Sequence, residues 1–166
     1  MKSLLQKLLG RGALVWREST PSMHFLVAFS IAMALHVIAP LSLFFIDTTL
    51  LRFIGIVLLL VALILNTLAL TAFKAHATPH APFATPTALI TTKIFAYSRN
   101  PVYLALVIVE VGFGFIVDSG WFFVMALMLF VSLNRYIIPN EERILQESFA
   151  EAYAEYKQRV GRWVSL

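Results

Sequence analysis

Long apolar stretches separated by short polar segments dominate the chain. They cover residues 24–46, 50–73, 102–117 and 121–138. The first contains no Lys, Arg, Asp or Glu, and the second is interrupted only by Arg52 at its edge and Asn66 within. Because a helix needs about 20 apolar residues to cross the hydrocarbon core of a bilayer, this pattern predicts an all-α polytopic membrane protein with about four transmembrane helices.

The connections between neighbouring stretches predict two helical hairpins. Almost no loop is left at residues 48–49, so residues 24–73 are expected to form a tight hairpin, with Pro40 kinking its first helix near the far end. An Asp-Ser-Gly turn at residues 118–120 joins the last two stretches, because Asp and Gly are turn formers. Residues 102–138 are therefore expected to form the second hairpin.

The two flanking segments carry apolar residues at helical spacing. Residues 1–23 combine leucines with basic residues, which is typical of a short interfacial helix. Residues 139–166 are expected to form a cytoplasmic amphipathic helix and tail, with Asn140 capping the helix after Pro139. The apolar face of that helix would consist of Leu145, Phe149, Ala152, Tyr153, Tyr156 and Val160.

The basic residues predict how the chain is oriented. All of the 13 Lys and Arg residues except Arg52 lie before the first apolar stretch, within residues 74–101, or at and after the end of the last stretch. Since loops rich in Lys and Arg stay on the cytoplasmic side, both termini and residues 74–101 are expected there, in a bacterial inner membrane. No signal peptide is expected, because the first apolar stretch lacks a small-residue cleavage site.

Composition narrows the range of functions. The chain of 166 residues is 60% hydrophobic and 13% charged, whereas a soluble domain is roughly 45–50% apolar and about 25% charged. The absence of cysteine excludes disulfides, a thiol nucleophile and Cys-based zinc sites. The net charge of +4 lies beside apolar spans, which favours anionic lipids over nucleic acid as its counterpart. His76 and His80 are too loosely arranged to predict a metal site.

Polar residues concentrate in a long loop and in a junction near the end of the chain. Residues 74–101 exceed the 2–8 residues usual between packed helices, which is typical of a functional loop. We expect this loop, with Arg99, to meet the junction that carries Arg135, Glu141 and Glu142, and to form one pocket with it. Simpler interpretations stay open, because the two carboxylates suit the first turn of a helix and Arg99 suits an interfacial anchor.

Glu110 lies in the middle of the third apolar stretch. A carboxyl group at that depth is costly, so it is expected either to bond a neighbour such as Asn66 or His36, or to line a cavity. A transporter that uses Glu110 as a proton-coupled binding group is therefore an alternative function. A non-catalytic assembly partner that retains the fold is another.

Short motifs flank the second predicted hairpin. They read Ser98-Arg99-Asn100-Pro101-Val102-Tyr103, then Glu141-Glu142-Arg143-Ile144-Leu145, then Phe149-Ala150-Glu151-Ala152-Tyr153-Ala154-Glu155-Tyr156. In order and spacing they resemble Arg-(His/Asn)-Pro-x-Tyr, Glu-Glu-x-x-Leu and Phe-Gly-x-x-Tyr-x-x-Tyr. These are the signature of the isoprenylcysteine carboxyl methyltransferase family and its phospholipid methyltransferase relatives. The resemblance covers residues 78–160, half of the chain.

The resemblance implies a membrane methyltransferase that uses S-adenosylmethionine without a Rossmann domain and acts on a lipophilic small molecule or lipid. It implies catalytic roles for Glu141 and Arg135. The cofactor-binding residues that it implies are Leu89, Ile90, Phe95, Arg99, Asn100, Pro101, Tyr103, Glu141 and Glu142. These residue types suit methyl transfer, because a carboxylate can bind the ammonium group of the cofactor and Arg99 its carboxylate.

Some positions depart from the family pattern. Lys93 stands where many relatives have glycine before the aromatic residue, and Ala150 replaces the glycine of the tail motif. Ile137 occupies the position at which the carboxyl methyltransferases place a substrate-binding arginine, and the nearby Arg135 points elsewhere on a helix. A prenylated cysteine carboxylate is therefore not the expected substrate, and the methyl acceptor stays open.

Overall fold

The computed structural model describes residues 20–42, 48–78 and 86–165, and all regular structure within these ranges is helical. The predicted all-α fold is confirmed. Most of the expected interfacial segment, residues 1–19, lies outside the described ranges. The elements are α2 (Pro21–Ile38), α3 (Thr48–Ala75), η1 (Lys93–Ala96), α4 (Pro101–Ile116), α5 (Gly120–Ser132), η2 (Leu133–Ile137) and α6 (Ile138–Arg159).

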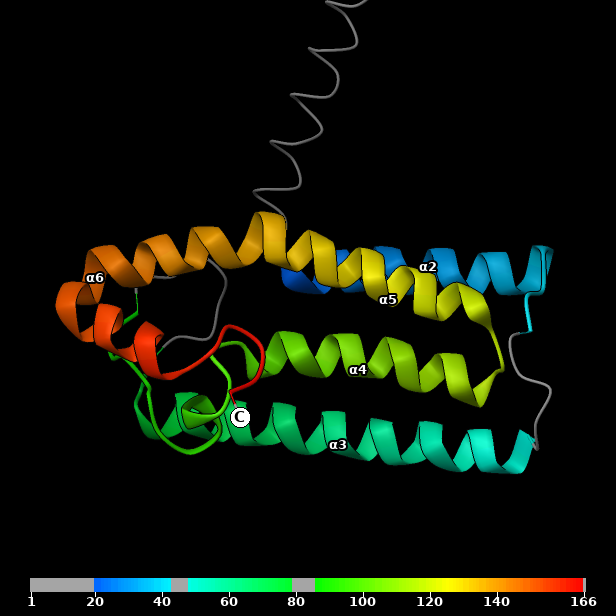
Figure 1. The fold of residues 1–166 in the computed structure, drawn as a ribbon, viewed down its shortest axis with the longest axis horizontal. Coiled ribbons are helices and arrows are strands. Elements are labelled where there is room, and N and C mark those ends of the chain that lie inside the picture. Colours follow the sequence, from blue (N-terminus) through cyan, green and yellow to red (C-terminus); the bar gives the residue numbers. More distant parts are fainter. Residues whose placement is uncertain (1–19, 43–47, 79–85, 166) are drawn as a thin grey trace, which may run out of the picture.

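The bundle in Figure 1 consists of α2, α3, α4 and α5 lying roughly parallel or antiparallel to one another. Within the described ranges, three helices are long and apolar enough to cross a membrane, namely α2, α3 and the continuous helix Gly120–Arg159 that begins with α5. At 16 residues α4 is shorter. Helix α2 ends at Ile38, before Pro40, so the predictions of one helix over residues 24–46 and of a kink at Pro40 were wrong.

The first two helices do not form the predicted tight hairpin. Instead α2 packs mainly on α5, while α3 packs on α4 (Figure 1). The chain after α2 is bonded to the start of α5, because the Gly120 N–H donates to the Leu41 carbonyl over 2.7 Å and the Trp121 indole donates to the Ala39 carbonyl over 2.6 Å. These bonds draw α2 toward α5. The second predicted hairpin, α4 with α5, is confirmed.

Small residues let α3 approach its neighbours closely. A Cβ atom on Gly55 would come within 2.6 Å of the Gly112 carbonyl oxygen, so only glycine fits this crossing with α4. Nearer the other end of α3, the fully buried Ala72 belongs to a cluster with Ile90 and Phe95. This packing fixes the segment that precedes α4 against the helix bundle.

Helix α5 runs into α6 without a break, through the π-helical turn η2. The Ile138 N–H bonds to the Leu133 carbonyl, which is the i to i−5 pattern of a π-helix, and Pro139, which has no N–H, follows directly. The prediction that Asn140 caps a new helix was wrong, because no helix end exists there. Glu141 and Glu142 consequently lie within a continuous helix, which removes the free N-terminus that the helix-dipole interpretation requires.

Helix α6 bends sharply at Ala150, where φ is 39° and ψ is −108°. The bend turns the second half of α6 back toward the segment that precedes α4 (Figure 1). Lys93, at the start of η1, also has a positive φ of 56°. Both residues stand where the resembled family carries glycine, which adopts a positive φ without the steric cost that a side chain brings, so the backbone is strained at these two positions.

Replacing Ala150 by glycine is expected to raise the free energy of unfolding by about 1 kcal/mol, because glycine adopts a positive φ without the steric cost that alanine has. Thermal or denaturant unfolding in detergent measures the change. Ala152→Gly is the matched control, since Ala152 is exposed on the same helix and has ordinary helical geometry. This substitution should lower the free energy of unfolding by about 1 kcal/mol. Equal destabilisation by both substitutions would contradict strain at Ala150.

Candidate active site

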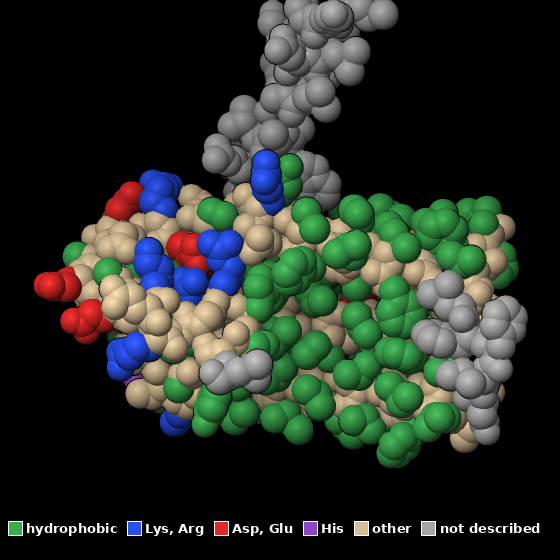
Figure 2. Space-filling view, in the orientation of Figure 1, with side chains coloured by type: hydrophobic (Ala, Val, Ile, Leu, Met, Phe, Trp, Pro, Cys, Tyr) green, Lys and Arg blue, Asp and Glu red, His purple; other side chains and the backbone are tan. Residues whose placement is uncertain are grey.

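A cavity of about 690 Å³ lies between α2, α3, α4, α6 and the segment before α4, within the size range of small-molecule sites. Figure 2 shows that charged side chains gather at one end of the molecule, over α6 and the residues after it, while hydrophobic side chains predominate over the helix bundle. Every residue expected to bind the cofactor lines the cavity. These residues are Leu89, Ile90, Phe95, Arg99, Asn100, Pro101, Tyr103, Glu141 and Glu142.

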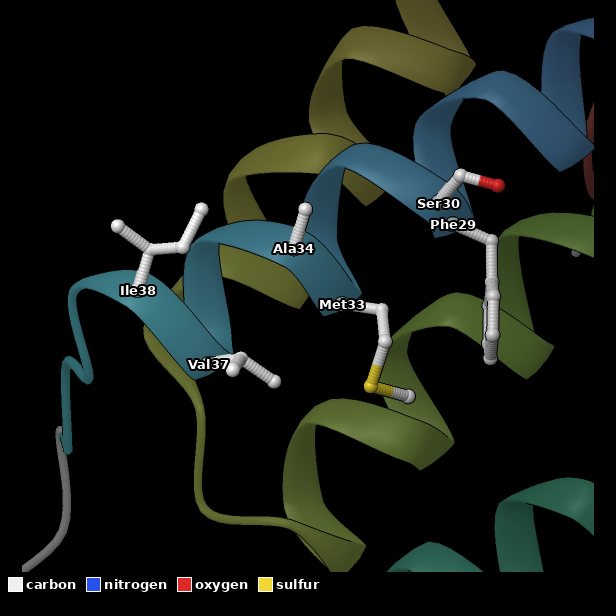
Figure 3. Close-up of a pocket in the computed structure, with 6 residues that line it drawn as sticks. All are labelled: Phe29, Ser30, Met33, Ala34, Val37 and Ile38. Atoms are coloured by element: carbon white, nitrogen blue, oxygen red, sulfur yellow. The ribbon is translucent and has the colours of Figure 1, made fainter.

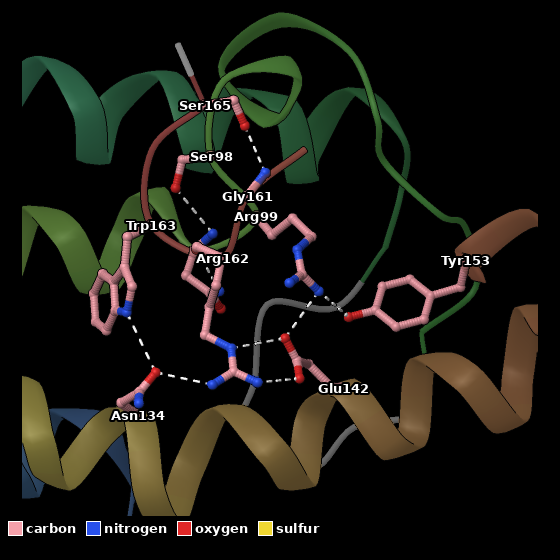
Figure 4. Close-up of polar contacts among 10 residues, drawn as sticks. Ser98, Arg99, Asn134, Glu142, Tyr153, Gly161, Arg162, Trp163 and Ser165 are labelled. Atoms are coloured by element: carbon pink, nitrogen blue, oxygen red, sulfur yellow. Dashed lines mark hydrogen bonds and ion pairs between the residues drawn. The ribbon is translucent and has the colours of Figure 1, made fainter. Parts of the chain in front are cut away.

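Glu142 is the centre of an ion-pair network at one wall of the cavity (Figure 4). Its Oε1 accepts from Arg99 Nη1 at 2.8 Å and from Arg162 Nε at 3.0 Å, and its Oε2 accepts from Arg162 Nη2 at 2.6 Å. Arg99 Nη1 also donates to the Tyr153 hydroxyl at 3.1 Å. The Arg99 side chain is only 12% exposed, which does not fit an interfacial anchor in contact with lipid headgroups.

Glu141 has a different partner from its neighbour. Its Oε1 accepts from the Tyr103 hydroxyl at 2.5 Å, a bond that joins the middle of one long helix to the first turns of α4. The motif before α4 and the motif in α6, far apart in sequence, thus meet through two contacts, one between Tyr103 and Glu141 and one between Arg99 and Glu142. Opposite charges therefore stand side by side in one cavity.

The bend at Ala150 brings aromatic side chains to the cavity. Tyr153 and Tyr156 are buried, and the Tyr156 hydroxyl donates to the Phe95 carbonyl over 2.6 Å. The ring of Phe95 packs edge-on against Phe73 of α3, with centroids 5.4 Å apart. The motif at residues 149–156 thereby holds the η1 segment in place, and its rings provide flat apolar surface beside the charged groups.

Comparison with known families decides the relationship of the chain. The model of the phospholipid methyltransferase family matches residues 50–152, more than half of the chain. The chain belongs to the phospholipid methyltransferase family. No curated protein and no solved structure matched it significantly. With its apolar helices, this phospholipid methyltransferase domain is an integral membrane protein.

The expected catalytic residue Arg135 does not reach the cavity of this phospholipid methyltransferase domain. It lies on η2 with an exposed side chain and does not line the site. Ile137, at the position where the carboxyl methyltransferases place an arginine, is fully buried in a core cluster with Leu133 and Ile138. The geometry therefore leaves Arg135 outside the candidate site.

Sequence reasoning missed the residues that complete the network. Arg162 is bonded to Glu142, and its Nη1 donates to the Asn134 side chain at 2.9 Å. The Trp163 indole donates to the same Asn134 oxygen at 3.3 Å. Arg162 and Trp163 lie beyond the residues that match the phospholipid methyltransferase family. The residues after α6 show no helical or strand periodicity. The sequence therefore marked Arg162 only as a polar residue that follows a helix with a strong apolar pattern.

Glu110 makes neither of the hydrogen bonds suggested by the sequence and lies outside the cavity described above. It is fully buried in α4, and among the described residues its carboxylate has no hydrogen-bond partner, so it bonds neither Asn66 nor His36. It does not line the cavity either, whereas Asn66 does.

His76 and His80 were not expected to form a metal site. The Nδ1 atom of His76 lies 2.9 Å from the Ala72 carbonyl oxygen, and His80 lies outside the described ranges.

A second depression, of about 490 Å³, lies along the far part of α2 (Figure 3). Its lining residues are Phe29, Ser30, Met33, Ala34, Val37 and Ile38. Figure 3 shows Phe29 and Met33 directed toward α4. The lining carries no charged group, so it offers nothing that would orient a polar ligand.

Proposed function

We propose that the whole chain is a single membrane domain that transfers a methyl group from S-adenosylmethionine to a lipophilic or membrane-embedded acceptor. The proposal is supported by one observation above the others, namely that the family motifs around Arg99 and Glu141 converge on a single cavity that offers both charges. Glu141 is assigned a role in the site, and Arg135 is not.

The residues of the cavity fit the cofactor chemically. Its amino-acid end carries an ammonium group and a carboxylate, which suit Glu141 and Arg99 respectively. The Nε atom of Arg99 is buried and has no hydrogen-bond partner among the described residues, so this guanidinium has a donor to spare. Phe95, Tyr103 and Tyr153 line the same space and suit the adenine ring.

The chain contributes binding, orientation and exclusion of water. When bound, the cofactor supplies a sulfonium-activated methyl group, so the protein needs to supply little covalent chemistry. Glu141 and Arg99 fix the polar end of the cofactor, while the tyrosines and Phe95 keep the site apolar around it. Such a site works by holding two reactants in line within a water-poor cavity.

A lipophilic acceptor suits the wall of the cavity that faces the helix bundle. Leu70 and Phe73 of α3 and Leu106 of α4 line that wall, and Ser22 contributes from α2. Because α2 packs on α5 rather than on α3, the chain leaves the cavity bordered by two helices that are not tightly paired. An acceptor that resides in the bilayer can enter sideways between them, while the polar cofactor arrives from the aqueous side.

We place this site at the cytoplasmic surface of a bacterial inner membrane. In this arrangement α2, α3, α4 and α5 are the four spans, α6 lies at the cytoplasmic surface with its apolar face toward the core, and both termini are cytoplasmic. The distribution of Lys and Arg along the sequence supports this orientation. Of these basic residues, Arg52 alone belongs to the opposite end of the proposed spans. The short α4 would then leave its first turn, with Tyr103, near the membrane surface.

Binding of S-adenosylhomocysteine, the demethylated product, by the purified full-length protein in detergent tests the proposal. Isothermal titration calorimetry should give saturable binding of one molecule per chain, and excess ATP should not compete, since it shares only adenosine. Absence of saturable binding up to millimolar concentration would refute the cofactor assignment. The acceptor is then sought by transfer of labelled methyl groups into extracts of membrane lipid.

A further inference from the structure

The chain folds back over the candidate site after α6. The Gly161 carbonyl accepts from the Arg99 N–H at 3.2 Å, the Arg162 carbonyl accepts from the Asn100 side chain at 2.9 Å, and the Ser165 N–H donates to the Tyr97 carbonyl over 2.8 Å. The Trp163 ring stacks on Phe130 with centroids 4.5 Å apart. Residues 160–165, called the tail here, are thus bonded to the motif before α4 and packed on α5.

Within the tail, the Arg162 guanidinium is held rigidly. Two of its nitrogens contact the two oxygens of Glu142, and the third donates to Asn134, so all three nitrogens are engaged by named partners (Figure 4). Side-on pairing of this kind is the strong, directional mode of arginine with a carboxylate. Arg162 is therefore the principal counter-ion of Glu142, and Arg99 contributes a single bond.

This arrangement determines which charges are left for a ligand. Glu142 has one negative charge and two guanidinium partners, so pairing with Arg162 leaves the charge of Arg99 uncompensated at this carboxylate. Glu141 accepts from a neutral tyrosine hydroxyl, so its charge is also uncompensated by a cation among the described residues. With Glu141 ionised, the site presents one net cation and one net anion, which matches a zwitterion.

We propose that Arg162 is a positioning residue that makes the site selective for a zwitterionic amino-acid group, by neutralising Glu142 and leaving Arg99 free to bind a carboxylate. The inference rests on the proposed binding of S-adenosylmethionine and goes beyond the residues that the family motifs contain. Without Arg162, Glu142 would take Arg99 as its counter-ion. The site would then keep its attraction for the ammonium group and lose its attraction for the carboxylate.

Two ligands separate these effects. S-adenosylhomocysteine carries both groups, and its decarboxylated analogue, S-adenosyl-3-thiopropylamine, keeps the amine alone. In the full-length protein, Arg162→Gln should lower the affinity for S-adenosylhomocysteine about tenfold or more. The affinity for the decarboxylated analogue should stay the same or rise. Arg162→Lys retains the charge and should restore most of the lost affinity. Arg159→Gln, an exposed arginine outside the cavity, is the control and should alter neither affinity.

Glu142→Gln provides an independent test with the opposite sign. Removing this carboxylate leaves both guanidinium groups uncompensated, so the preference for S-adenosylhomocysteine over the decarboxylated analogue should increase. Equal losses for both ligands in Arg162→Gln, or a Glu142→Gln change in the same direction as Arg162→Gln, would overturn the inference. Failure of the unaltered protein to bind S-adenosylhomocysteine would instead refute the proposed function.

Discussion

Replacing Arg99 by alanine is expected to weaken binding of S-adenosylhomocysteine by about ten- to a hundredfold. A charge-assisted hydrogen bond contributes about 1.5–3 kcal/mol, and the Arg99 side chain lies in the cavity with 12% exposure, where water replaces it poorly. Folding should survive, because Glu142 keeps both of its bonds from Arg162. Calorimetric titration and a thermal unfolding midpoint, measured on the same sample, separate loss of the ligand from loss of the fold.

Arg143→Ala is the matched control for this prediction. Arg143 lies in α6 and forms an ion pair with Glu147, one helical turn further along. The two side chains are 64% and 63% exposed, so this ion pair contributes at most about 1 kcal/mol. Its removal should leave affinity unchanged. If Arg99→Ala behaved in the same way, Arg99 would be a structural partner of Glu142 and not a ligand of the cofactor.

The apolar pattern predicted where the helices lie, but it did not predict which helix packs on which. Residues 50–73 and 102–117 became α3 and α4 nearly as expected, because a long uninterrupted apolar run without Pro favours a continuous helix. The partner of α2 was mistaken, since a short connection suggested a hairpin with α3. Backbone bonds from Leu41 and Ala39 to the start of α5 decide that pairing instead, and such bonds have no sequence signature.

Proline misled the assignment of the last helix. A proline normally marks a helix boundary, so Pro139 and Asn140 predicted a new start. The π-helical turn η2 shifts the hydrogen bonds by one residue and lets the helix continue through Pro139. Continuity matters for the site, because it carries Glu141 and Glu142 on a rigid element that begins with α5 and removes the helix-dipole explanation for their presence.

The candidate site could be predicted only as far as its motifs reach. The sequence predicted that Arg99 and Glu141 would approach one another, and both do line one cavity. Which carboxylate pairs with which partner required coordinates, since adjacent residues on a helix point in different directions. Arg162 could not be predicted at all, because its position depends on the bend at Ala150 and on the path of the tail.

The substitutions Glu141→Gln and Glu110→Gln are expected to have different consequences, a large loss for Glu141 and almost none for Glu110, and this contrast separates an enzyme from a transporter. Glu141 lines the cavity beside Arg99, so an amide there removes the charge that suits the ammonium group of the cofactor. Affinity for S-adenosylhomocysteine should fall about tenfold or more, and transfer of labelled methyl groups into lipid extract should fall with it.

Glu110→Gln should leave both quantities nearly unchanged. Glutamine has almost the same shape, and Glu110 is buried in α4 away from the cavity lining, so no step of binding or orientation in the proposed site depends on its charge. A proton-coupled transporter requires the reverse order, because its function depends on an ionisable group inside the membrane. If Glu110→Gln alone abolished function, the transporter interpretation would prevail. If both variants retained full activity, neither carboxylate would belong to the functional site, because a buried group that can lose its charge without effect supports neither mechanism.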